Sequence, residues 1–152
     1  MTTMVKDINS LVGINEKAYK SICNIFEGKI PSDQLDDMTA SLEKMTQRYH
    51  YQIRVVGAVF YFHIWIFDEK HEFNGNAGVS ALVSAINGAG DIYTDDIDKL
   101  YGETVSFSFE SAGPYFSVQF FNKEHKLLGH LQAGGLGNPG IGGGTGKWKN
   151  RE

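Results

Sequence analysis

Residues 59–67 read VFYFHIWIF, a run of aromatic and β-branched side chains interrupted by one histidine. Such residues favour β-strands, in which successive side chains point to opposite faces of the sheet. One face of this predicted strand carries Phe60, Phe62, Ile64 and Ile66. The opposite face carries Tyr61, His63, Trp65 and Phe67. A strand with two apolar faces is usually covered on both sides, so the sequence must supply a cover for the second face or leave it for a partner.

Further predicted strands place this run in one antiparallel β domain. Apolar and polar residues alternate in residues 51–55, 105–109 and 116–120, and residues 127–133 return as another strand. The last three segments are consecutive, which favours a meander that exposes serine and glutamine on one face. Residues 78–90 fit a helix about as well as a strand, and residues 94–102 predict a short capped helix. We therefore predict a mainly β fold with a compact antiparallel barrel over residues 49–150.

The first 48 residues have helical patterning and predict an N-terminal helical extension, residues 1–48. The clearest helix covers residues 32–48, with Ser32 as its N-cap. Its apolar stripe consists of Leu35, Met38, Leu42 and Met45. Residues 15–27 predict a second helix that ends at Gly28, and residues 3–12 a further short helix that ends at Gly13. These helices need a surface to pack on, and the β domain is the candidate within the chain.

The C-terminal end of the chain is rich in glycine and permits two interpretations. A flexible linker is one, because glycine-rich chains are often unstructured. An ordered last strand or wide turn is the other, because Leu136, Ile141 and Trp148 punctuate the glycines. We favour the ordered strand, in which glycine permits tight curvature and close approach of the backbone.

Composition excludes several classes of function. The net charge of −4, without a basic cluster, argues against nucleic acid as the main partner. No apolar run approaches the ~20 residues of a transmembrane helix. Lys6 and Asp7 interrupt the N-terminus where a signal peptide would be apolar, so either the protein is not exported by that route or a leader is missing. The sequence indicates no oligomeric state.

The polar residues form no catalytic or ligand-binding motif, so we predict no catalytic residue, no cofactor and no metal. The five histidines lack the spacing of a zinc site, and the single cysteine, Cys23, cannot complete one. The segment GGGTGK at residues 142–147 lacks the first glycine of a phosphate-binding loop, because Ile141 stands there. A hydrolase remains an alternative only if His63 or His130 lies beside a carboxylate in a cleft.

The face that carries Tyr61, His63, Trp65 and Phe67 is the candidate binding surface. If the N-terminal helices cover this face, its aromatic side chains belong to the core. If the helices pack elsewhere, the face is free for a protein, membrane or glycan. The sequence alone leaves both arrangements open.

Three C-terminal motifs resemble one known family. They are YFSVQFF at residues 115–121, LGHLQAG at 128–134 and GGGTGKW at 142–148. A phenylalanine-rich strand, an LG-x-(F/L)-QAG strand and a GGG-(S/T)-G-x-W strand occur in this order in the virulence-associated protein (Vap) family of actinobacterial intracellular pathogens. Residues 49–113 fit the family in outline only.

The resemblance implies a small eight-stranded Greek-key barrel with one helix. It also implies a secreted, non-enzymatic effector that acts on the host endolysosomal system by binding a membrane or a protein. Family members usually have a signal peptide and a disordered, polar N-terminal region, and this chain shows neither, so a cytoplasmic location is the alternative. A small lipid- or glycan-binding barrel is a further alternative, which a cavity inside the barrel would favour.

Overall fold

A computed structural model describes residues 2–4, 8–58, 61–78, 86–112, 115–134 and 139–151. Eight strands form a closed antiparallel barrel, and a short strand, β1 (Thr2–Met4), pairs with the start of β2. The barrel strands are β2 (Gln47–Ala58), β3 (Tyr61–Phe67), β4 (His71–Gly78), β5 (Ile86–Thr94), β6 (Ser106–Ala112), β7 (Tyr115–Phe121), β8 (Leu127–Gly134) and β9 (Gly140–Asn150). The helices are α1 (Ile8–Phe26), α2 (Ser32–Ser41), a 3₁₀ turn η1 (Leu42–Lys44) and α3 (Ile97–Glu103).

The strand order around the barrel is β2-β3-β4-β9-β6-β7-β8-β5, and β5 closes it by pairing with β2. β9 returns beside β6 after the β6-β7-β8 meander, and β5 returns beside β2 after β2-β3-β4. Each set of four strands therefore has the spatial order of a Greek key. The predicted mainly β, eight-stranded Greek-key barrel is confirmed.

Aromatic and aliphatic side chains fill the barrel. Phe62, Ile64 and Ile66 on β3 are completely buried, as the alternation along this strand predicted; Phe60 lies outside the described residues. Phe62 stacks on Phe109 with 4.2 Å between ring centroids and 4° between ring planes. Stacked and edge-to-face rings of this kind pack a core densely.

The glycine-rich end is the ordered strand β9, as we predicted. Its alternate glycines face the core, where Gly142 lies against the ring of Phe109, Gly146 against the ring of Phe73, and Gly144 against the backbone of Asn76. A Cβ atom on Gly142 would lie 2.7 Å from Cε1 of Phe109, so a side chain there would force the ring to shift. Trp148 packs in the core at 5.4 Å from the ring of Phe73 and 5.7 Å from that of Phe120. The glycines of β9 therefore make room for the aromatic core.

The helices differ from the predicted ones in their boundaries. The helix predicted over residues 3–12 is wrong at its start, because residues 2–4 form β1. α1 begins at Ile8 and runs through Gly13 without a break into the helix predicted over residues 15–27. Gly28 has a φ of +78° and ends this helical segment as predicted. α2 ends at Ser41 rather than Arg48, because the chain enters β2 at Gln47. Ser32 is the first helical residue of α2 and not its N-cap.

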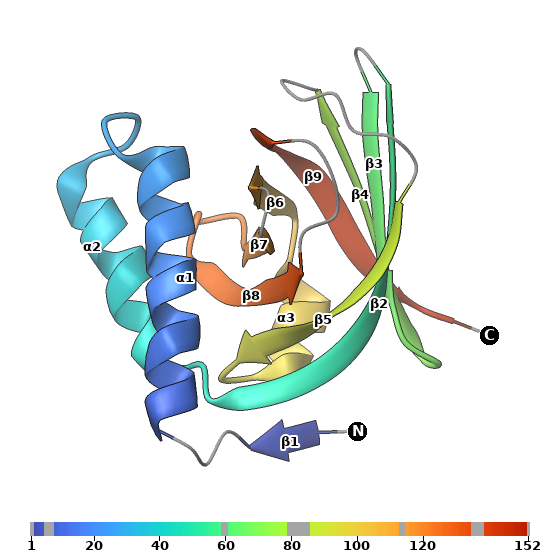
Figure 1. The fold of residues 1–152 in the computed structure, drawn as a ribbon, viewed down its shortest axis with the longest axis horizontal. Helices are drawn as coiled ribbons and strands as arrows, with labels where there is room; N and C mark the ends of the chain where they lie inside the picture. Colours follow the sequence, from blue (N-terminus) through green and yellow to red (C-terminus); the bar gives the residue numbers. More distant parts are fainter. Residues whose placement is uncertain are drawn as a thin grey trace.

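α1 packs on the outer surface of β6, β7 and β8, and α2 packs on α1. A second apolar cluster forms there from Ala18, Ile22, Met38, Leu42, Met45, Tyr93, Phe121 and Leu127. Figure 1 shows the two helices on one side of the barrel, with β3, β4 and β9 on the other. The short helix α3 follows β5, its N-cap Asp96 accepts a hydrogen bond from the Lys99 backbone at 3.1 Å, and its Leu100 joins the barrel core.

Candidate functional site

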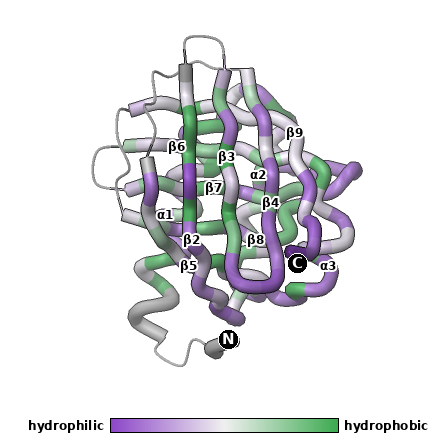
Figure 2. Tube along the Cα trace, turned by 90° about the vertical axis from the view of Figure 1, so that its right-hand side faces the viewer, coloured by the Kyte–Doolittle hydropathy of each residue, from purple (hydrophilic) through white to green (hydrophobic). Residues whose placement is uncertain are grey.

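The aromatic stripe, which we define as Tyr61, His63, Trp65 and Phe67, lies on the outer face of β3. The side chain of Tyr61 is 47% exposed, and the other three are half-buried. α1 packs on the opposite side of the barrel, against β6, β7 and β8, and α2 packs on α1. Figure 2 views the molecule from the side of β3 and β4. The first arrangement considered from the sequence, in which the helices cover this face, is therefore wrong.

Three of the four side chains of the stripe, Tyr61, His63 and Trp65, form a ladder along β3. The rings of His63 and Trp65 are 3.9 Å apart between centroids, and those of Tyr61 and His63 are 6.1 Å apart. The hydroxyl of Tyr61 lies 3.0 Å from Nδ1 of His63. These contacts hold the three rings against one another along the strand, so this part of the stripe presents a preformed aromatic surface.

Two arginines lie on the rings of the stripe. Arg54, opposite Trp65 on β2, has its guanidinium carbon 5.6 Å from the centre of the Trp65 ring. Arg151 places its guanidinium carbon 4.7 Å from the centre of the Phe67 ring. Both distances allow cation–π attraction. The stripe is therefore aromatic with positive charge along its edges.

β4 and β9 continue this outer face with polar and basic residues. Glu72 on β4 accepts a hydrogen bond from Asn74 at 2.6 Å and lies 3.2 Å from Nζ of Lys149 on β9. Burial alone would raise the pKa of Glu72, but the hydrogen bond from Asn74 and the charge of Lys149 outweigh it and lower the pKa. Lys147, also on β9, is exposed and pairs in register with Asn74. The four basic residues beside the stripe, Arg54, Lys147, Lys149 and Arg151, outnumber three described carboxylates, which are Glu72 and, at the Phe67 end, Asp68 and Glu69.

The face under the helices is polar and buried. We expected serine and glutamine on the β6-β7-β8 meander to be exposed, and this is wrong, because α1 covers them. Ser108 donates to Gln119 at 2.6 Å, and Gln119 donates to Ser117 at 2.8 Å. Glu110 on β6 accepts hydrogen bonds from Ser21 and Asn24 of α1. Hydrogen bonds satisfy these buried groups, as burial requires.

His130 lies in this polar layer and is completely buried. Gln132 Nε2 donates a hydrogen bond to its Nδ1 at 3.0 Å, and the ring stacks on Tyr93 at 5.3 Å. Burial lowers the pKa of His130 to about 3, so the imidazole is neutral. His63, in turn, contacts Tyr61 and Asn74. Among the described contacts, neither histidine has the carboxylate partner that a hydrolase would need.

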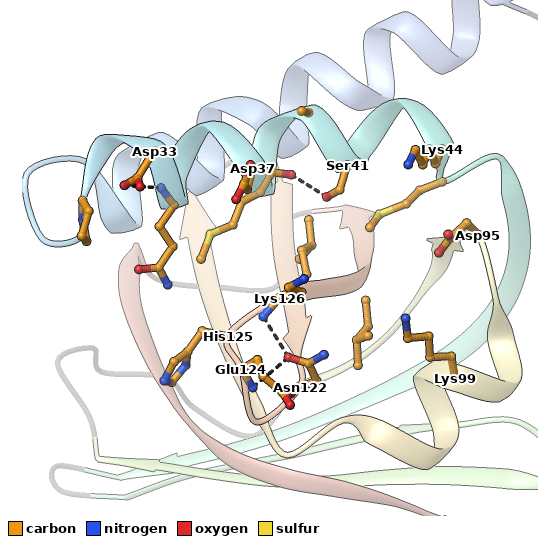
Figure 3. Close-up of a pocket in the computed structure, with 17 residues that line it drawn as sticks. Asp33, Asp37, Ser41, Lys44, Asp95, Lys99, Asn122, Glu124, His125 and Lys126 are labelled. Atoms are coloured by element: carbon orange, nitrogen blue, oxygen red, sulfur yellow. Dashed lines mark hydrogen bonds between the residues drawn. The ribbon is translucent and has the colours of Figure 1, made fainter.

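Two hollows lie where the helices meet the barrel, and the sequence did not predict either. The first has a volume of about 710 Å³ and lies between α2, the β7–β8 turn and α3. Figure 3 shows charged side chains of both signs around it, with the Asn122 side chain accepting hydrogen bonds from the Glu124 and Lys126 backbone. The second, of about 680 Å³, lies between the end of α1 and strands β6 and β9, and is mainly apolar.

Two other histidines do lie beside carboxylates: His50 Nδ1 is 2.9 Å from Asp91, and His71 Nδ1 is 3.6 Å from Asp68. Neither pair lines one of the two hollows. Within the described part of the chain, no three histidine, cysteine or acidic side chains are grouped to hold a metal ion. None of the described helices combines the length and the apolar character needed to cross a membrane.

The barrel and its C-terminal strands agree with a known family. A sequence model of the Rhodococcus equi virulence-associated protein family matches residues 8–149. The chain belongs to this family. Its three C-terminal motifs, from which we inferred the resemblance, lie on β7, β8 and β9.

Two solved structures of virulence-associated proteins from the intracellular pathogen Rhodococcus equi are similar to this chain. VapB is 34% identical with a TM-score of 0.59, over 68% of this chain and 99% of VapB. VapD is 32% identical with a TM-score of 0.59, over 67% of this chain and 98% of VapD. No curated protein matches the chain. Each of the two structures therefore leaves about a third of this virulence-associated protein uncovered.

Proposed function

We propose that this chain is a non-enzymatic, secreted virulence-associated effector that binds a host membrane through its aromatic stripe. The observation that carries the proposal is the pairing of Trp65 with Arg54 and of Phe67 with Arg151 on an uncovered sheet face. Tryptophan and tyrosine favour the membrane–water interface, where their rings lie at the level of the lipid head groups.

The charge around the stripe supports an anionic surface as the partner. Arg54, Lys147, Lys149 and Arg151 belong to β2, β9 and the residue after β9, and the Arg54, Lys147 and Lys149 side chains are exposed. Each basic residue near an anionic membrane contributes ~1 kcal/mol of attraction. The chain as a whole carries a net charge of −4, so attraction depends on this face turning toward the membrane.

The two other functions considered from the sequence have less support. A barrel that encloses a lipid or glycan needs an interior cavity, and aromatic rings such as Phe62 and Phe109 pack the barrel core. A hydrolase needs a histidine beside a carboxylate in a cleft, and the described partners of His63 and His130 are tyrosine and amide groups. His50 does lie beside Asp91, but it is exposed and outside both hollows. The test below also distinguishes a membrane from a protein as the partner of the stripe.

The test is sedimentation of the full chain with lipid vesicles at pH 7 and pH 5. We expect binding to vesicles of phosphatidylcholine and phosphatidylserine. Trp65→Ala should weaken it about tenfold, the effect of ~1.4 kcal/mol. Tyr19→Ala is the matched control, because Tyr19 is a 52% exposed aromatic residue on α1, on the other side of the barrel.

Absence of binding at both pH values would sink the membrane proposal. Equal losses in Trp65→Ala and Tyr19→Ala would show that the stripe is not the binding face. If the chain does not bind vesicles but captures a host protein, and Trp65→Ala abolishes that capture, the stripe is a protein-binding surface instead. Circular dichroism of each variant checks that the barrel remains folded.

A further inference from the structure

The second hollow, which we call the α1–β9 groove, has apolar walls. Its volume is about 680 Å³, within the ~300–1,000 Å³ range of small-ligand sites. Side chains from the end of α1, from α2 and from the barrel form the walls, among them Ile25, Phe26, Ile30, Met38, Phe121 and Ile141. Such a lining favours alkyl groups over polar ligands.

Small residues keep the floor of the groove open. Ser108 on β6 and Gly143 on β9 pair in register and both line the groove. A Cβ atom on Gly143 would lie 2.9 Å from the carbonyl oxygen of Phe107, so a larger residue does not fit the backbone there. The two strands thus present a bare floor beneath the apolar end of α1.

The charged groups of the groove are of one sign. Lys29 lies in its lining together with His125, and no aspartate or glutamate is among the described residues that line it. The groove also adjoins the charged cavity of Figure 3, because Gln34, Met38 and His125 line both hollows. The apolar walls match the alkyl end of an amphiphile, and the lysine beside the polar cavity matches its anionic end.

We propose that the α1–β9 groove binds a single-chain anionic amphiphile, with the alkyl chain along the apolar walls and the carboxylate or phosphate head near Lys29. A free fatty acid and a lysophospholipid share this chemistry. The site is separate from the aromatic stripe, because it lies between the helices and the barrel while the stripe is on β3. The groove proposal can therefore succeed or fail independently of the membrane proposal.

The test is displacement of a fluorescent fatty acid from the full chain by oleate, by oleoyl lysophosphatidic acid and by uncharged monoolein. Ser106→Trp places an indole in the groove, because Ser106 lines it. Thr145→Trp is the matched control, since Thr145 pairs in register with Ser106 but is exposed and outside the lining. Gln34→Glu tests the charge with almost no change in shape.

We expect oleate, lysophosphatidic acid or both to displace the probe. The stronger competitor shows whether the site prefers a free fatty acid or a lysophospholipid. Ser106→Trp should weaken binding of the displacing ligand at least tenfold, and Thr145→Trp should leave that binding unchanged. Gln34→Glu and Lys29→Gln should weaken the anionic ligands several-fold relative to monoolein.

Failure of both anionic ligands to displace the probe from the folded protein would overturn the proposal. So would equal displacement from Ser106→Trp and Thr145→Trp, because the ligand would then lie elsewhere. If Ser106→Trp fails to fold, Gln34→Glu decides, and equal effects on oleate and monoolein would refute the placement of the head group at Lys29.

Discussion

Ser21 on α1 donates a hydrogen bond of 2.8 Å to Glu110 on β6, across 89 positions of the chain. Glu110 is only 7% exposed, and its carboxylate also accepts hydrogen bonds from Asn24 at 3.0 Å and Tyr115 at 2.9 Å. A buried carboxylate is stable only when such donors satisfy it. This group therefore joins the N-terminal helix to the barrel.

Glu110→Ala should detach α1 from the barrel more than it unfolds the barrel. The change leaves Ser21, Asn24 and Tyr115 without their acceptor, which costs ~3 kcal/mol. Hydrogen exchange of the α1 amides should therefore become much faster, with smaller changes in β2 and β3. Glu103→Ala is the control, because Glu103 is exposed on α3 and should have little effect. Uniformly faster exchange throughout the barrel would contradict a local role.

Acid should destabilise the protein through His130. Burial lowers its folded pKa to about 3, below the ordinary value of 6.5, so the unfolded chain binds a proton that the folded chain does not. The stability that this neutral histidine contributes is complete above pH 6.5 and decreases as the pH falls toward 3. The free energy of unfolding should be ~2 kcal/mol lower at pH 5 than at pH 7.

His130→Gln should flatten this dependence, because glutamine cannot gain a proton and can still bond to Gln132. Urea unfolding at pH 5, 6 and 7 measures the slope for both proteins. An unchanged slope in the variant would assign the acid sensitivity to other groups.

Two glycine-to-alanine changes should have opposite signs. Gly142→Ala should destabilise the protein by ~1–3 kcal/mol, because the added Cβ would lie 2.7 Å from Phe109 in the packed core. Gly13→Ala should stabilise it by ~1 kcal/mol, because this position lies inside α1 with nothing within 4 Å of the new Cβ. Thermal unfolding of both variants checks the prediction, and a stabilising Gly142→Ala would show that the core can yield.

Charge reversal beside the stripe should affect anionic membranes alone. Arg54→Glu removes one positive charge and adds a negative one, so binding to phosphatidylserine vesicles should weaken ~10–30-fold at low salt. Lys123→Glu makes the same change of charge on the β7–β8 turn, on the side of the helices, and should have a smaller effect. High salt should reduce the difference between the variants. Equal effects of the two substitutions would indicate a response to net charge rather than to the stripe.

The strands that the sequence predicted best have large, alternating side chains. β3 and the β6-β7-β8 meander were recognised because phenylalanine, isoleucine and valine recur at every second residue. β4 was missed, because two of its three core-facing residues are Gly75 and Ala77. A Cβ on Gly75 would lie 2.7 Å from the ring of Phe107, so the neighbouring aromatic residue requires the glycine that conceals the strand.

The sequence by itself determined the two faces of each strand. The alternation of side chains follows from the extended backbone, so Tyr61, His63, Trp65 and Phe67 had to share one face and Ser106, Ser108 and Glu110 another. Which of these faces the helices cover was decided only by the tertiary structure. A general preference for burying apolar surface favoured the aromatic face, but the bonds of Ser21 and Asn24 to Glu110, together with the apolar cluster beside them, place α1 on the polar one. Those contacts join residues far apart in the chain, which no local pattern records, and they leave the aromatic stripe uncovered.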